Sequence, residues 1–156
     1  LATMHGLHLV QMDVKAAFLY GELNAHEQLY MAVPDGVEPP EPGMVCRLKK
    51  AIYGLKQASR RWFERLTQHL ASLGLESIEI DPCVFVVRGK HFIAIVTIYV
   101  DDMILAYDNK AMMQRIVDGL KKQFRMKVEE LRYCLGVEMV RDGDGGVLLR
   151  QSAYIE

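Results

Sequence analysis

HFIAIVTIYVDDMILAY, residues 91–107, contains two apolar runs that meet at a pair of aspartates. Residues 91–100 are apolar at both alternating sets of positions, which is typical of a strand buried on both faces inside a sheet. Residues 103–107 form a second apolar run that is long enough for a strand. We therefore predict a hairpin with Asp101 and Asp102 at its tip.

The sequence on either side predicts further strands and helices around this hairpin. A strand at residues 83–88 would be joined to the strand at 91–100 by a tight turn at Gly89 and Lys90. The remaining predictions are a strand at 7–13, a short helix or turn at 16–23, an amphipathic helix at 57–73, a second helix at 112–124, and a last hairpin of 131–140 and 147–151 that turns at 142–146. Together they predict an α+β domain, an antiparallel sheet with helices packed on one face.

The composition sets limits on the class of protein. The chain has 156 residues, 51% of them hydrophobic and 25% charged, as expected for one globular domain. Its formal net charge of -1 gives no overall attraction to nucleic acid. The 3 cysteines are too far apart for a metal site or a disulfide framework, which favours a reducing compartment. The longest apolar run is too short to cross a bilayer. Because the first residue is Leu1, we expect a fragment of a longer open reading frame.

Positive charge is concentrated in residues 47–65, the basic stretch. Its bases are Arg47, Lys49, Lys50, Lys56, Arg60, Arg61 and Arg65, and its single acid is Glu64. A phosphate backbone would bind such a stretch. A solvated helix face is the commoner meaning of such a run, and charge alone favours that interpretation.

Three carboxylates are the candidate catalytic and metal-binding residues. Asp101 and Asp102 adjoin a buried strand, where they repel each other and lose hydration unless a cation is present. Asp13 also ends an apolar strand, and pairing of the two strands would bring Asp13 and Asp101 together. Such oxygens suit Mg²⁺. Because neighbouring strand residues point in different directions, we expect Asp13 and Asp101 to be the main pair and Asp102 to support them. The alternative to a metal site is that Asp101 and Asp102 simply form a solvated turn.

Four segments carry a family resemblance: QMDVKAAFL at 11–19, YGLKQA at 53–58, YVDD at 99–102 and LGVE at 135–138. Their order and spacing resemble those of Ty1/copia-type retrotransposon reverse transcriptases, the RNA-dependent DNA polymerase domain of a Gag-Pol polyprotein. The resemblance runs from about Leu7 to the C-terminus. It implies that residues 1–156 are the central, palm-containing part of that domain, without most of the fingers and the thumb.

The resemblance also implies roles for individual residues. Asp13, Asp101 and Asp102 would be catalytic and hold two Mg²⁺ ions, for which Mn²⁺ can substitute. Phe18 would crowd the sugar 2′ position, although residue type alone favours a core phenylalanine. Contacts to the nucleotide and template are implied for Phe18, Tyr53, Gly54, Lys56 and Gln57. A hairpin resembling the primer grip includes Tyr133, Leu135, Gly136 and Glu138, whose apolar members also suit a plain sheet core.

The implied function is RNA-directed DNA polymerase activity, two-metal nucleotidyl transfer to a primer 3′-hydroxyl. Its partners would be an RNA template, a DNA primer, deoxynucleoside triphosphates, and the remaining reverse transcriptase, RNase H and integrase regions of a parent polyprotein in cytoplasmic virus-like particles. No membrane partner is expected. The alternatives are a truncated or relic transposon product, inactive alone and at most a nucleic-acid-binding module, and an unrelated two-metal phosphodiesterase.

Two positions and one segment depart from the family pattern. Tyr20 replaces an asparagine before Gly21, and Ser59 replaces a proline. Between Lys127 and Leu131 the chain is one residue short, with Val-Glu-Glu where Asp-Leu-Gly is expected. This last difference affects the connection into the primer-grip-like hairpin and the match of Lys127 to a lysine proposed as general acid in the family.

Overall fold

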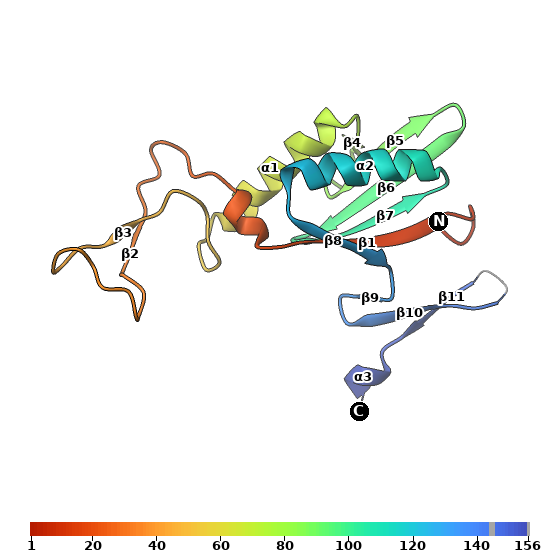
Figure 1. Cartoon of the computed structure of the whole chain (residues 1–156). Coiled ribbons are helices and arrows are strands. Elements are labelled where there is room, and N and C mark those ends of the chain that lie inside the picture. The colour runs from red at the N-terminus through yellow and green to blue at the C-terminus, as the bar shows by residue number, and fades with distance from the viewer. Residues whose placement is uncertain (144–145, 156) are drawn as a thin grey trace. The chain divides into compact units, whose positions relative to one another are not determined.

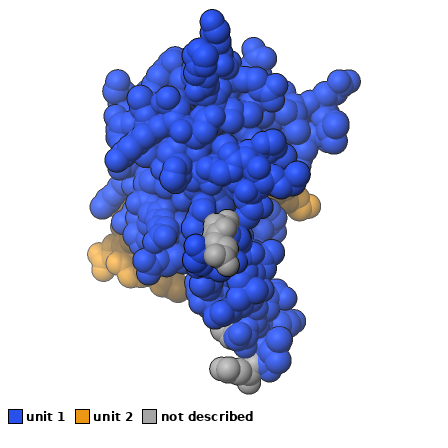
Figure 2. All heavy atoms as spheres, turned by 90° about the vertical axis from the view of Figure 1, so that its right-hand side faces the viewer, with its two compact units in different colours: residues 1–15, 69–156 blue, residues 16–68 orange. Residues whose placement is uncertain are grey.

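The computed structural model describes residues 1–143 and 146–155, except the side chain of residue 153, and it forms two compact units (Figures 1 and 2). Unit 1 comprises residues 1–15 and 69–156, and unit 2 comprises residues 16–68. The α+β class and the antiparallel sheet predicted from the sequence are confirmed.

Unit 1 is built on a six-stranded antiparallel sheet with the order β4-β5-β6-β7-β1-β8. Its strands are β1 (His8–Val14), β4 (Glu76–Ser77), β5 (Val84–Gly89), β6 (Phe92–Tyr99), β7 (Asp102–Tyr107) and β8 (Met126–Glu130). Strand β6 lies in the interior of this sheet, as predicted, and β1 is the neighbour of β7. The pattern did not predict β8 or the two-residue strand β4.

One face of this sheet is buried and the other is half-buried, so the expectation that β6 is fully buried on both faces is wrong. Ala94 and Val96 of β6 have no exposed surface, whereas Ile93 and Ile95 are half-buried. Helix α2 (Lys110–Gln123) contacts β6 and β7 and lies over one face in Figure 1. Its buried residues include Ile116, Val117 and Leu120.

The turn between β5 and β6 is one residue later than predicted. Gly89 pairs with Phe92, so the loop is Lys90–His91 rather than Gly89 and Lys90. The Phe92 ring occupies the space that a side chain at position 89 would need. A larger residue at position 89 would have to displace this ring, so the glycine serves packing within the strand, whereas a pattern that associates glycine with turns places it in the loop.

Residues 131–140 do not form the single strand that was predicted. The chain reverses at Leu135 and Gly136, between β9 (Tyr133–Cys134) and β10 (Val137–Arg141). Strand β11 (Val147–Arg150) then completes a three-stranded sheet with the order β11-β10-β9. The predicted turn at 142–146 includes residues 144 and 145, which lie outside the described residues.

Unit 2 has little regular structure apart from its helices. It contains the 3-10 helix η1 (Ala17–Tyr20), the strands β2 (Tyr30–Met31) and β3 (Cys46–Arg47), and most of helix α1 (Ala58–Ser72). Both helices agree with the sequence prediction. Trp62 and Leu66 are buried on the apolar stripe of α1. Within the described ranges, no helix is long and apolar enough to span a bilayer.

The last turn of α1 belongs to unit 1 and is attached to α2. His69 Nε2 lies 2.9 Å from the Gly119 carbonyl oxygen, and the His69 ring meets Phe124 edge-on with the ring centroids 5.5 Å apart. Leu73 fills the space beside Gly119, where a larger residue would collide with it. A small residue in α2 thus lets the end of α1 approach closely.

Candidate active site

The three predicted aspartates lie at the edge of the sheet where β1 and β6 end and β7 begins. Asp13 is directly opposite Asp102 in the β1–β7 register. Asp101 lies in the two-residue loop Val100–Asp101, and its carbonyl oxygen accepts a hydrogen bond from the Val14 N–H at 3.2 Å. The backbone therefore holds the hairpin tip against the end of β1.

Asp13 and Asp102 lie on the half-buried face of the sheet, which we call the carboxylate face. Residues opposite each other in an antiparallel pair share a face, and neighbours along a strand do not. Met12 and Met103, which also oppose each other, are accordingly on the buried face. The apolar face anchors the two strands, and the same alternation presents the two carboxylates away from the core.

Burial raises the pKa of Asp13 above its ordinary value of 3.8, and the charges of Asp101 and then Asp102 raise it further. Lys15 acts in the opposite direction. The dominant causes both penalise the ionised carboxylate. A cation bound at this point would stabilise the ionised carboxylate and offset both effects.

The loop that carries Asp101 has a backbone conformation that is unusual for its residue type. Val100 has φ 58°, in the left-handed region. A β-branched residue is strained there, and such strain is found most often at functional sites. Asn or Gly would be the ordinary choice for a two-residue hairpin loop.

The carboxylate face continues across β1 and β8 as a patch of polar side chains. Gln11 Nε2 donates to Asp102 Oδ1 at 3.3 Å. On β8, Lys127 opposes Asp13, and its Nζ lies 2.5 Å from Glu129 Oε2. This ion pair raises the pKa of Lys127.

The donor set fits a hard divalent cation. Carboxylate oxygens are the ligands that Mg²⁺ takes from proteins, usually one or two of them together with substrate phosphates and water. In the part of the chain that the structure describes, no three His, Cys, Asp or Glu side chains are grouped closely enough to hold a metal by themselves.

The residues expected to contact the nucleotide and template lie in unit 2, where two of them touch. The rings of Phe18 and Tyr53 have centroids 4.3 Å apart. Phe18 is 9% exposed and Tyr53 is 59% exposed. Gly54 has φ 93°, Lys56 is exposed and Gln57 is half-buried just before α1. The burial of the Phe18 ring is also what we expect if Phe18 is an ordinary core residue.

The basic stretch carries less available charge than its composition indicates. Arg61 Nη2 lies 3.0 Å from Glu27 Oε1, and its Nη1 lies 2.8 Å from Glu64 Oε2. Arg60 Nε lies 2.9 Å from Glu64 Oε1. The hydrogen bond to Glu27 is the main cause of the raised pKa of Arg61. Arg60 and Arg61 therefore serve local pairing, and the exposed bases at 47–56 are the better candidates for phosphate contact.

The hairpin of β9 and β10 lies near the carboxylates. Burial, followed by the charge of Asp102, raises the pKa of the Cys134 thiol. Leu135 and Gly136 both have positive φ, 51° and 78°, and Leu135 is 57% exposed. Tyr133 is 50% exposed and opposes the half-buried Glu138.

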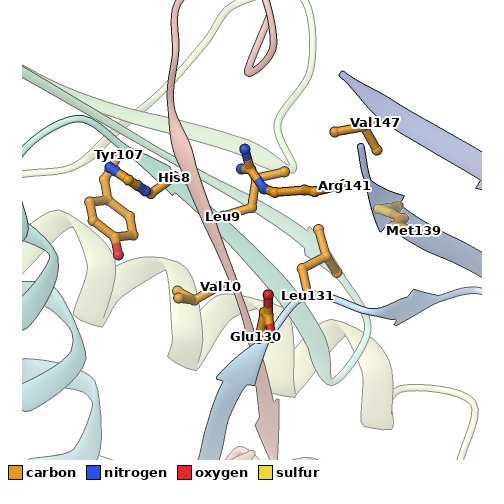
Figure 3. Close-up of a pocket in the computed structure, with 9 residues that line it drawn as sticks. All are labelled: His8, Leu9, Val10, Tyr107, Glu130, Leu131, Met139, Arg141 and Val147. Carbon is orange, nitrogen blue, oxygen red and sulfur yellow. The ribbon is translucent and has the colours of Figure 1, made fainter. Parts of the chain in front are cut away.

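Two cavities in unit 1 adjoin this region. One of about 480 Å³ is lined by Gln11, Glu129, Glu130, Arg132 and Tyr133. The other, of about 520 Å³, lies between the start of β1 and the β10–β11 hairpin in Figure 3. Arg141 reaches across it and donates to the Leu7 carbonyl oxygen at 3.1 Å. None of the three aspartates lines either cavity.

Sequence reasoning did not assign a role to Gln11 or Glu27. Gln11 lies two residues before Asp13, so strand alternation places both on one face, but its partner Asp102 is 91 residues away. Glu27 lies outside the basic stretch, and no local signal connects it to Arg61.

Comparison with known proteins identifies the family. A family model described as reverse transcriptase (RNA-dependent DNA polymerase) matches residues 1–156. The chain is 37% identical over 160 residues to the "Retrovirus-related Pol polyprotein from transposon TNT 1-94" of Nicotiana tabacum, a match that covers 100% of this chain and 12% of the tobacco protein. It is 38% identical over 137 residues to the transposon RE2 polyprotein of Arabidopsis thaliana, covering 86% and 9%.

A yeast relative extends the comparison to the Ty1 group. The "Transposon Ty1-BL Gag-Pol polyprotein" of Saccharomyces cerevisiae is 34% identical over 151 residues, covering 89% of this chain and 8% of the yeast protein. The chain thus spans only about a tenth of the length of these curated relatives. The match over all 156 residues shows that the chain belongs to the reverse transcriptase (RNA-dependent DNA polymerase) family of Ty1/copia-type Pol polyproteins.

Proposed function

We propose that residues 1–156 are the central, palm-containing part of an RNA-directed DNA polymerase that transfers deoxynucleotides to a primer 3′-hydroxyl on an RNA template. The observation that carries the proposal is the placement of Asp13, Asp101 and Asp102 at one edge of the sheet, where β1 and β6 end and β7 begins, in a chain of this family. Its partners would be the other regions of a Gag-Pol-type polyprotein. The cytoplasmic, particle-borne location implied by the resemblance stays a prediction.

Asp13 and Asp101 would supply the main metal-binding oxygens, and Asp102 would support them. Two Mg²⁺ ions, when bound, would lower the pKa of the attacking hydroxyl and neutralise charge on the triphosphate. The chain itself contributes rigidity: the Val14 N–H holds the Asp101 backbone, and β1 and β7 fix Asp13 opposite Asp102. Phe18 would exclude the ribose 2′-hydroxyl. Contacts to the nucleotide and template would come from Tyr53, Gly54, Lys56 and Gln57. The primer end would be positioned by the hairpin that contains Tyr133, Leu135, Gly136 and Glu138.

Metal titration of the folded chain tests this proposal. Because a cation relieves the repulsion among the carboxylates, Mg²⁺ or Mn²⁺ should raise the melting temperature. At about ten times Kd the gain is roughly 1.4 kcal/mol, equivalent to about 3–5 °C for a chain of this size. Asp101→Asn should abolish most of the rise, while Asp118→Asn, on the exposed side of α2, should leave it unchanged. An equal metal response in wild type and Asp101→Asn would contradict the assignment.

A further inference from the structure

Resting on the proposed function, we propose that Gln11 is a positioning residue that restrains Asp102, so that Asp102 supports the Asp13–Asp101 pair with one defined oxygen. Gln11 Nε2 donates to Asp102 Oδ1 at 3.3 Å. Both side chains are half-buried on the carboxylate face. The bond joins β1 to β7 beside the proposed metal-binding residues.

The strand register makes this contact possible. Gln11 and Asp13 lie two residues apart on β1 and share a face. Asp102 opposes Asp13, so Gln11 is its diagonal neighbour, within reach of a long side chain. The residue directly opposite Gln11 on β7 is Ile104, whose side chain offers no hydrogen bond.

The neighbouring residue on β8 is already paired. Glu129 opposes Gln11, but its carboxylate binds Lys127. Gln11 directs its amide toward Asp102 on β7 rather than toward Glu129 on β8. The arrangement separates two polar pairs on one face: Lys127 with Glu129, and Gln11 with Asp102.

Engagement of Oδ1 changes what Asp102 offers to a cation. A carboxylate has two oxygens, and the Gln11 bond fixes the rotation of the group while leaving Oδ2 available. Asp102 would then act through one oxygen from a preset direction. Partners of this kind orient metal ligands, and their removal typically weakens metal affinity roughly 10–100-fold.

Replacement of Gln11 should not disturb the packing of the hydrophobic core. Gln11 borders the open cavity of about 480 Å³. A methionine at this position has nearly the same length and keeps the apolar stem, but it cannot donate a hydrogen bond. The chain also offers a matched control: Gln114 Nε2 donates to Asp118 Oδ1 at 2.8 Å on the exposed side of α2, so Gln114→Met removes the same kind of bond elsewhere.

The experiment measures Mn²⁺ binding to the 156-residue chain by electron paramagnetic resonance of the free ion. Gln11→Met should raise Kd about tenfold, and Gln11→Leu should give a similar loss. In an Asp102→Asn background, Gln11→Met should have no further effect, because its action passes through Asp102. Gln114→Met should bind as wild type does. Circular dichroism and urea unfolding check that each variant is folded.

The outcomes separate this inference from the proposed function. Binding that is lost in Asp101→Asn but unchanged in Gln11→Met overturns the role of Gln11 alone. So does an equal loss from Gln11→Met in the presence and absence of the Asp102 carboxylate, which would indicate a general structural effect. Mn²⁺ binding that is insensitive to Asp101→Asn overturns the proposed metal site and this inference together.

Discussion

At the scale of single residues, the sequence reveals the three carboxylates themselves but not the contacts and backbone conformation around them. Asp13, Asp101 and Asp102 can be recognised because each adjoins an apolar strand. The hydrogen bond from Gln11 and the positive φ of Val100 cannot be recognised in this way. The first joins residues 91 positions apart, and the second contradicts the preference of valine for extended backbone.

Asp13 should make stability depend on pH in the absence of metal. Its pKa is higher in the folded chain than its ordinary value of 3.8, so the folded state binds this proton more tightly. Stability is therefore lost as pH rises from the ordinary value through the raised folded value, and Asp13 destabilises the neutral-pH fold. Asp13→Asn should increase the free energy of unfolding at about pH 7 and have little effect below the ordinary pKa.

Urea unfolding in a chelator, at several pH values, measures this effect. Asp118→Asn on the exposed side of α2 is the control and should show no such gain. A neutral-pH stability of Asp13→Asn equal to or below that of wild type would show that Asp13 is not electrostatically strained.

Phe18 also poses a question about a single residue. Its ring either excludes the ribose 2′-hydroxyl or is an ordinary part of the core. In a polymerase-competent parent protein, Phe18→Val should raise the ratio of ribonucleotide to deoxynucleotide incorporation by about tenfold, since a steric contact is worth roughly 1–3 kcal/mol. The ring also packs on Tyr53, so some loss of stability is expected. Single-nucleotide incorporation assays measure the ratio. An unchanged ratio would leave Phe18 as a core residue.

At the scale of elements, apolar periodicity predicts the strands and helices that have a buried side. It predicts β1, β5, β6, β7, α1 and α2, with ends differing by one to a few residues. It misses β8, MKVEE, because an edge strand with three charged residues has only Met126 and Val128 half-buried. It also runs through the reversal at Leu135 and Gly136, where an apolar residue occupies a position that normally favours Asn or Gly.

Gly21 offers a test of how η1 is joined to α1 in unit 2. A Cβ at position 21 would lie 2.9 Å from Arg61 Cβ and 3.0 Å from the Trp62 backbone nitrogen. Because a backbone atom cannot move aside as a side-chain tip can, Gly21→Ala should reduce the free energy of unfolding by about 1–3 kcal/mol. Gly143→Ala, where a Cβ meets open space, should be nearly neutral. Equal unfolding midpoints for the two variants in urea would contradict the close approach.

At the scale of the whole molecule, residues 1–156 alone should not extend a primer. The chain spans 8–12% of the length of its curated relatives. Phosphoryl transfer depends on alignment of the reactants, which contributes roughly 7–11 kcal/mol in favourable cases. Carboxylates on one sheet face supply charge, but a duplex and a triphosphate also have to be held.

Extension of a DNA primer on an RNA template, with Mg²⁺, measures this prediction. The comparison is with a longer protein that restores flanking sequence from a related polyprotein, with Asp101→Asn as the inactive control. Robust extension by residues 1–156 that disappears in Asp101→Asn would contradict the prediction. Inactivity of the longer protein as well would favour the relic interpretation, in which the exposed bases at 47–56 provide at most weak, salt-sensitive nucleic-acid binding.

The pairing of Asp13 with Asp102 also has a consequence for synthesis of the chain on the ribosome. Strands β6 and β7 can close as a local hairpin within microseconds, but β1 is made long before β7 exists. At roughly 5–20 residues per second, the ribosome needs about 4–18 s to add the residues between them. Throughout that time β1, whose Met12 and Val14 are buried in the finished sheet, has neither of its neighbouring strands, β7 and β8, to pair with. A nascent chain that stalls before residue 102 would present β1 as an exposed apolar segment, a binding site for holdase chaperones.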